Sequence, residues 1–121
     1  MPVSAALVDG HAYYTATGFI SVDEAMAAVA AFNADHTAKH AIWDFRKGDL
    51  SQFSPNLFKR AARGAAAYAA RRGPGAKTAF FVATQDEVLL IKAFAGLAEG
   101  ETEIAFAAFT DFDDLLAWLE D

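Results

Sequence analysis

The sequence has no cysteine, only three prolines and no long hydrophobic run in its 121 residues. Without cysteine the chain has no disulfide and no thiol chemistry, which is typical of proteins in a reducing interior. No segment approaches the ~20 uninterrupted apolar residues of a membrane-spanning helix, and the first residues lack the basic start of a secretory leader. These absences predict a cytoplasmic protein without a membrane span.

Hydrophobic residues make up 55% of the chain, and many of them are alanine. This share, together with the scarcity of proline, argues against a disordered protein. A chain of this length is the size of one domain, and because alanine buries little area, aromatic side chains must supply much of the core. We therefore expect a single domain over residues 1–121. The alanine content is also typical of a bacterium with a GC-rich genome.

Basic residues are concentrated in one stretch of an acidic chain. The formal net charge is −6, but residues 46–77 carry eight basic side chains against the single acid Asp49. This stretch is either a solvated helix face or a basic surface that meets an anionic ligand or the acidic residues 99–103 of a second copy. The acidic remainder would repel a phosphate backbone, which disfavours nucleic acid. The candidate residues of the basic interaction surface are Lys59, Arg60, Arg63, Arg71 and Arg72.

Two segments in the second half of the chain have the pattern of a strand, a cap and a helix. An apolar run over residues 77–83 ends at Thr84 and continues as a helical pattern. A second run, over residues 104–109, does the same after Asp111. Repeated strand and helix units indicate parallel strands, because a parallel connection needs a crossover long enough to hold a helix.

The first half of the chain supplies the remaining elements. Asp9-Gly10 has the conformational freedom that a tight hairpin turn demands. A helix capped by Ser21, a strand over residues 40–45 and a helix over residues 55–71, capped by Ser54, are predicted to follow. The expected fold class is α/β, with an N-terminal β-hairpin, repeated βα units, a mostly parallel five-stranded sheet and four helices.

This order of elements resembles the STAS-like domains, the family of the anti-sigma-factor antagonist of sporulation. Nearly the whole chain is similar to a bacterial branch described as STAS/SEC14-like proteins of unknown function. The likeness is carried by GFISVDEA at 18–25, IWDFR at 42–46, TAFFV at 78–82 and FTDFDDLLAWL at 109–119. The resemblance implies a non-catalytic module for protein interaction or regulation. It also implies that the crossover helices share one sheet face, so that the terminal helix or a second subunit covers the other. We therefore expect a homodimer.

The longest irregular connection follows the predicted strand over residues 40–45. In the antagonists, as the resemblance implies, a phosphorylatable serine lies here in an Asp-Ser-Ser/Thr-Gly-like motif, which this sequence lacks. A phosphate at the start of the next helix would still gain from unpaired N–H groups and basic neighbours, although Ser54 already suffices as a cap. The candidate ligand or switch residues are Asp44, Arg46, Lys47, Ser51 and Ser54.

No catalytic, cofactor-binding or metal residues are expected. His36 and His40 have the spacing of a helical metal pair, but they fall between a helix and a strand. Two functions are left open. The first is a non-catalytic interaction module. The second is a protein that binds a small anionic or lipid-like ligand in a pocket at the carboxyl ends of the parallel strands. A concave site with both Asp44 and Arg46 pointing into it would favour this second function.

Overall fold

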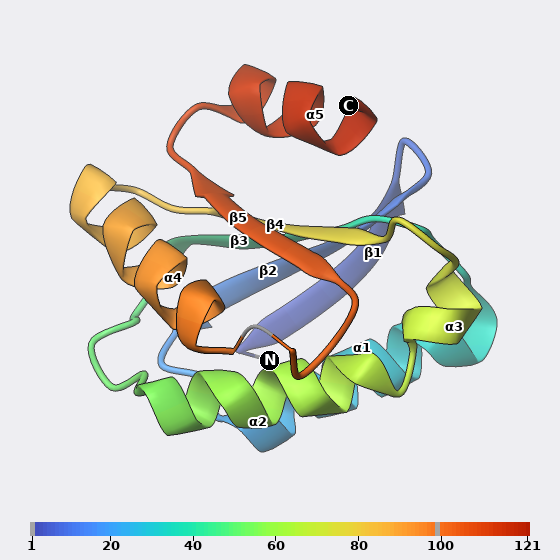
Figure 1. Cartoon of the computed structure of the whole chain (residues 1–121), viewed down its shortest axis with the longest axis horizontal. Coiled ribbons are helices and arrows are strands. Elements are labelled where there is room, and N and C mark those ends of the chain that lie inside the picture. The colour runs from blue at the N-terminus through green and yellow to red at the C-terminus, as the bar shows by residue number, and fades with distance from the viewer. Residues whose placement is uncertain (1, 99) are drawn as a thin grey trace.

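Five strands form one sheet in the computed structural model, which describes residues 2–98 and 100–121. The strands are β1 (Val3–Val8), β2 (His11–Gly18), β3 (Ala41–Gly48), β4 (Lys77–Phe81) and β5 (Ala105–Phe109). They lie side by side in chain order (Figure 1). The first two strands are antiparallel and every later pair is parallel, which confirms the expected hairpin and mostly parallel sheet.

Helices connect the strands and close the chain. They are α1 (Val22–Asp35), α2 (Pro55–Ala66), α3 (Ala69–Arg72), α4 (Gln85–Leu97) and α5 (Phe112–Glu120). The described residues contain one helix more than the sequence predicts, because the helix expected over residues 55–71 divides at Ala67 and Tyr68. The N–H groups of these residues bond to the carbonyls of Gly64 and Ala65, three positions back, and this tighter turn ends α2. Within residues 2–98 and 100–121, none of the helices is long and apolar enough to cross a membrane.

The residues predicted to start the helices do so with their side chains. Ser21, Ser54 and Asp111 each accept a hydrogen bond from the backbone N–H three residues further on. Such a bond satisfies one of the unpaired donors at a helix start. Asp9 and Gly10 make the hairpin turn with φ angles of 51° and 81°. Both lie in the left-handed region that a tight two-residue turn requires.

The sheet is covered on both faces, but unequally. Figure 1 shows α1 and α2 on one face and α5 on the other. The larger core lies under α1, α2 and α4 and includes Trp43 and Ile91, whereas the smaller core lies under α5 and includes Ile42 and Leu115. Since Ile42 and Trp43 are neighbours on β3, their separation confirms that this strand is internal and packed on both faces. The terminal helix α5 covers β4 and β5. For these two strands, the second face of the sheet is therefore covered by the chain's own last helix, one of the two covers that we expected.

Candidate functional site

A cavity of about 80 Å³ lies between the sheet and the helices α1 and α2. This volume is several times the roughly 10–15 Å³ that a single water molecule needs. Tyr14, Trp43 and Phe80 line it from three neighbouring strands, and Val29 and Ala62 line it from the two helices. The cavity therefore lies inside the larger core, where a protein interior is ordinarily close-packed.

Small side chains on α2 explain why this space is not filled. Ala61, Ala62 and Ala65 line the cavity and are too short to cross it. At Gly64 the same helix approaches α1 so closely that an added Cβ would meet the side chain of Met26. The alanine and glycine content of α2 therefore has two effects, close contact with α1 and open space above the sheet.

Three buried polar side chains, those of Tyr14, Asn33 and Thr78, also line the cavity. Tyr14 on β2 is 2% exposed and Asn33 on α1 is 4% exposed. Asn33 donates from Nδ2 to the carbonyl oxygen of Val29 at 2.8 Å, whereas the Tyr14 hydroxyl makes no hydrogen bond to any residue that the structure describes. No fully enclosed side-chain polar atom in the described chain lacks a partner. The Tyr14 hydroxyl therefore keeps some accessible surface, and its residue is part of the cavity lining.

Arg72, at the end of α3, is the charged residue of the described cavity lining. Its Nε donates to the carbonyl oxygen of Lys39 at 3.0 Å, its Nη1 to Oγ1 of Thr78 at 3.1 Å, and its Nη2 to the carbonyl oxygen of Lys77 at 2.7 Å. Burial lowers the pKa of Arg72 against the opposing effect of Tyr14, yet a guanidinium stays protonated at neutral pH. The sequence predicts Arg72 on a basic surface, whereas the structure brings it to the cavity.

Two other residues of the predicted basic surface pair within the chain. Arg63 Nε lies 2.7 Å from Glu101 Oε2, and Arg60 Nη2 lies 3.7 Å from Asp23 Oδ1. The acidic segment after α4, expected to meet the basic helix of a second copy, thus supplies Glu101 to its own chain. Glu99 of that segment lies outside the described residues. The remaining candidates on this surface are Lys59 and Arg71.

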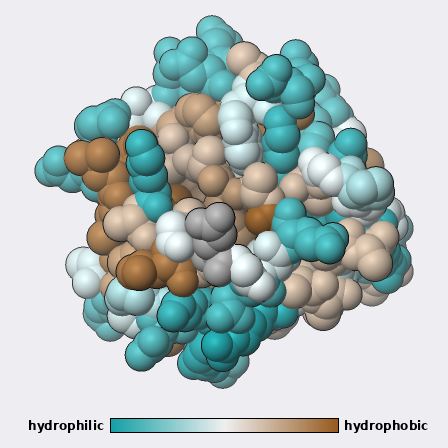
Figure 2. Space-filling model, viewed as in Figure 1, coloured by the Kyte–Doolittle hydropathy of each residue, from teal (hydrophilic) through white to brown (hydrophobic). Residues whose placement is uncertain are grey.

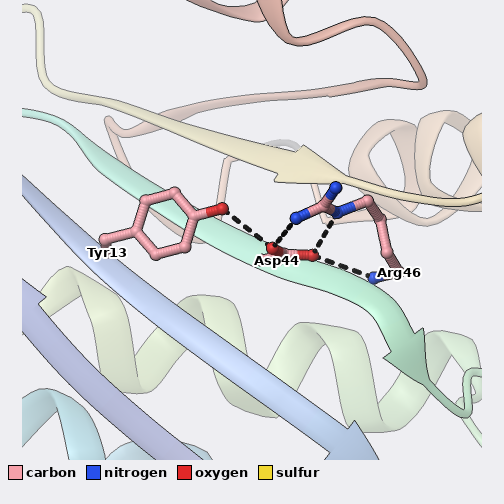
Figure 3. Close-up of polar contacts among 3 residues, drawn as sticks. All are labelled: Tyr13, Asp44 and Arg46. Atoms are coloured by element: carbon pink, nitrogen blue, oxygen red, sulfur yellow. Dashed lines mark hydrogen bonds and ion pairs between the residues drawn. The ribbon is translucent and has the colours of Figure 1, made fainter.

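Asp44 and Arg46 lie on the opposite face of the sheet from the cavity (Figure 3). Asp44 is 6% exposed. Its carboxylate accepts a hydrogen bond from the Tyr13 hydroxyl at 2.8 Å, from Arg46 Nε at 3.0 Å, from Arg46 Nη2 at 2.8 Å and from the Arg46 backbone N–H at 3.1 Å. The Arg46 guanidinium also lies 4.2 Å from the ring centroid of Phe81, within range of a cation–π contact.

These contacts determine the electrostatics of Asp44. Burial raises the pKa of Asp44, but the hydrogen bonds from Arg46 and Tyr13 outweigh burial and hold this pKa below its ordinary value. Burial and the Asp44 carboxylate together raise the pKa of Tyr13 to about 12. The carboxylate is therefore ionised and occupied by its own neighbours. Asp44 and Arg46 do not line the cavity beneath α1 and α2, because period-two alternation turns Trp43 and Phe45 toward it instead.

The other switch candidates, Lys47, Ser51 and Ser54, lie at the end of β3 and in the loop before α2. Ser54 Oγ accepts a hydrogen bond from the Leu57 N–H at 3.2 Å and so serves as the helix cap. The Ser51 N–H donates to Asp49 Oδ1 at 2.8 Å, so a phosphate on Ser51 would lie beside a carboxylate that repels it. Phosphorylation of either serine stays a prediction.

A second hollow lies near the carboxyl ends of β2 and β3, where the sequence predicts a pocket. It has a volume of about 110 Å³ and is lined by Phe19, Arg60 and residues at the start of α1. Ile20 and Phe53 line both this hollow and the cavity beneath α1 and α2. The two spaces therefore adjoin at the carboxyl end of the sheet, and the polar residues Tyr14, Asn33 and Arg72 line the cavity beneath α1 and α2.

A solved structure resembles this chain over almost its whole length. It is an uncharacterized protein of the DUF3478 family from Shewanella loihica PV-4, described as having a SpoIIAA-like fold. The TM-score is 0.57 at 15% identity, and the match covers 97% of this chain and 91% of the other. The chain has a SpoIIAA-like fold. The STAS-like architecture expected from the resemblance is thereby confirmed. No family model and no curated protein matches the sequence, and the likeness of the SpoIIAA-like fold carries no particular activity with it.

Proposed function

We propose that this SpoIIAA-like protein is a non-catalytic module that binds a small amphipathic molecule in the cavity beneath α1 and α2. The observation that carries the proposal is Tyr14, a buried residue that lines this mainly apolar cavity and whose hydroxyl bonds to none of the described residues. Core side chains that border open space forgo packing contacts, and a hydroxyl without a protein partner forgoes a hydrogen bond. A bound molecule with an apolar body and one polar end would remove both costs.

The chemistry of the lining favours binding over catalysis. Aromatic and aliphatic side chains dominate it, and its polar members are a few hydroxyl, amide and guanidinium groups. Among the described lining residues there is no histidine, carboxylate or serine that would serve as a general base or nucleophile. Apolar walls with a few placed polar groups are the usual composition of small-molecule binding sites.

A neutral fluorescent probe tests this function. N-phenyl-1-naphthylamine, which is apolar and uncharged near neutral pH, is expected to bind with one-to-one stoichiometry and enhanced fluorescence. Ala65→Leu adds bulk to the cavity wall and should weaken probe binding about tenfold or more, a loss of about 1.4 kcal/mol. Fluorescence titration of the two proteins measures the effect.

Ala67→Leu is the matched control for this titration. Ala67 is an exposed residue just after α2, and it does not line the cavity. The same added side chain should therefore leave probe affinity unchanged there. No probe binding, or equal losses from Ala65→Leu and Ala67→Leu, would overturn the cavity as the binding site.

The surface of α4 supports a second candidate function, interaction with a second copy of the chain. Leu89 and Leu97 are 56% and 55% exposed, and the exposed Ala93 lies midway between them on one helix face. Figure 2 shows hydrophobic surface on the side of the molecule where α4 lies. In a two-fold antiparallel pair of α4 helices that cross at Ala93, Leu89 of each copy would meet Leu97 of the other.

The uncovered part of the sheet is a weaker candidate for the homodimer. Strands β1 to β3 lie beyond the main contacts of α5, but on that face β2 and β3 carry Tyr13, Asp44 and Arg46, which bond to one another. Polar groups that already satisfy one another do not require a cover. We therefore place the proposed homodimer at α4, and a cytoplasmic location remains an expectation from composition.

Substitution of the two leucines tests the α4 interface. The unaltered protein is expected to sediment as a dimer at high micromolar concentration, and Leu89→Glu with Leu97→Glu to sediment as a monomer, because four buried carboxylates would face an apolar contact. Ala27→Glu with Ala30→Glu, at exposed positions on α1, is the control and should remain dimeric. A monomer for the unaltered chain, or a dimer that survives the leucine substitutions, would contradict this interface.

A further inference from the structure

The cavity holds one positive charge that the described chain does not balance. Arg72 lines the cavity, and its hydrogen bonds go to two backbone carbonyls and the hydroxyl of Thr78. No carboxylate of the described residues forms an ion pair with it. A partly buried guanidinium without a counter-charge is a costly arrangement that an anionic ligand would relieve.

We infer that the ligand is a monocarboxylate with an elongated apolar body, its carboxylate against Arg72 and Tyr14 and its body along the aromatic lining. This inference rests on the proposed function of the cavity and adds the chemical class of the ligand. Three features support this ligand class: the charge of Arg72, the hydrogen-bond donors of Arg72 and Tyr14, and the length of the cavity lining.

The donors of Arg72 are only partly used. A guanidinium has five N–H groups, and Arg72 donates one from each of its three nitrogens to Lys39, Thr78 and Lys77. One N–H remains on each terminal nitrogen. Two such groups on one planar cation match the two oxygens of a carboxylate. A single guanidinium balances one negative charge, which favours a carboxylate over a phosphate dianion.

Tyr14 supplies a further donor at the same site. Burial raises the pKa of Tyr14 to about 12, so its hydroxyl stays protonated at neutral pH. Tyr14 lines the same cavity from β2 that Arg72 lines from the end of α3. A carboxylate only accepts hydrogen bonds, and it therefore suits a site that offers N–H and O–H donors from Arg72 and Tyr14.

The length of the lining indicates an elongated ligand. Arg72 and Thr78 lie at the amino end of the parallel strands, while Leu50 follows their carboxyl end. Along β3 the lining extends from Ala41 to Phe45, four residue steps or about 13 Å at about 3.3 Å per residue. A medium-length acyl chain has about this length when extended, whereas a short acid such as acetate would span only a small part of it.

A matched pair of ligands separates the charge from the apolar body. Decanoic acid, ionised near neutral pH, and decanol are each used to displace N-phenyl-1-naphthylamine from the folded full chain. The unaltered protein should bind the acid about tenfold or more tightly than the alcohol. Arg72→Met should abolish this preference while decanol binding persists, and Tyr14→Phe should reduce it about two- to tenfold, as expected for one hydrogen bond. Arg71→Met, at the exposed neighbouring residue, is the control and should keep the preference.

The outcomes distinguish this inference from the proposed function. Probe binding with equal displacement by acid and alcohol overturns the carboxylate and leaves the cavity function intact, whereas absence of probe binding overturns both. If circular dichroism shows that Arg72→Met does not fold, Tyr14→Phe decides, because it removes one oxygen atom and no charge. An unchanged preference for the acid in folded Tyr14→Phe contradicts the placement of the carboxylate.

Discussion

Phe58→Ala is expected to lower the free energy of unfolding by about 3–5 kcal/mol, the usual cost of truncating a buried phenylalanine. Phe58 is 4% exposed. Its ring centroid lies 6.0 Å from that of Phe80, 5.8 Å from that of Phe94 and 5.6 Å from that of Phe106. Phe58 thus packs α2 against both the sheet and α4. Truncation removes these contacts and enlarges the adjoining cavity, and urea unfolding followed by circular dichroism measures the loss.

Leu57→Ala is the matched control for this substitution. Leu57 precedes Phe58 on α2 but is only partly buried. The loss there should be about 1 kcal/mol or less, because the partly exposed Leu57 buries less apolar area and alanine favours the helix. Equal losses at the two positions would show that Phe58 does not anchor α2 to the sheet.

Asp44→Asn is expected to cost about 1–3 kcal/mol of unfolding free energy at neutral pH, the range for leaving buried hydrogen-bonding groups without partners. The Asp44 carboxylate accepts four hydrogen bonds from Tyr13 and Arg46. An asparagine amide has one acceptor oxygen, and its NH₂ group would face donors. The half-exposed Arg46 side chain retains access to water, which keeps the expected loss below that of a fully buried ion pair.

The same substitution should also change the response of stability to acid. The pKa of Asp44 is lower in the folded chain than in the unfolded chain. Its contribution is therefore complete above the unfolded pKa of about 3.9 and is lost as the pH falls through the folded pKa. Asp44→Asn lacks this contribution and should lose less stability below about pH 4 than the unaltered protein.

Urea unfolding across the acid range tests this effect. Asp113→Asn, at an exposed position on α5, is the control and should retain the acid response of the unaltered protein. If Asp44→Asn loses stability below about pH 4 as steeply as the unaltered protein, the hydrogen bonds to Asp44 do not depress its pKa.

Local signals predicted most of this fold because its elements end at residues with strong conformational preferences. Asp9-Gly10 marks the hairpin turn, and the cap residues Ser54 and Asp111 mark helix starts that the structure confirms. The division of the predicted helix after Ala66 was not predictable from residues that all favour a helix. The extra helix follows from backbone bonding around Tyr68, which leaves no mark in the alanine-rich sequence.

The cavity was less predictable, because empty space depends on how distant side chains pack. Two signals nevertheless point to it. Tyr14 alternates with Ala12 and Ala16 on the core face of its strand, and Asn33 follows Val29 by four residues on the apolar face of α1. In each case a polar group interrupts a stripe that faces the core. The sequence also predicted a role for Asp44, but the alternation along β3 directs it to the opposite face of the sheet.

The unequal helix layers have a consequence for the dynamics of the chain. Helix α5 rests on β4 and β5 through Leu115 and Leu119, and Lys77 Nζ holds its last turn by donating to the carbonyl oxygens of Trp118 and Asp121. Local opening requires only that the contacts of the opening segment be lost. The carboxyl-terminal segment is therefore able to detach and exchange its amide hydrogens while the compartment beneath α2 stays closed.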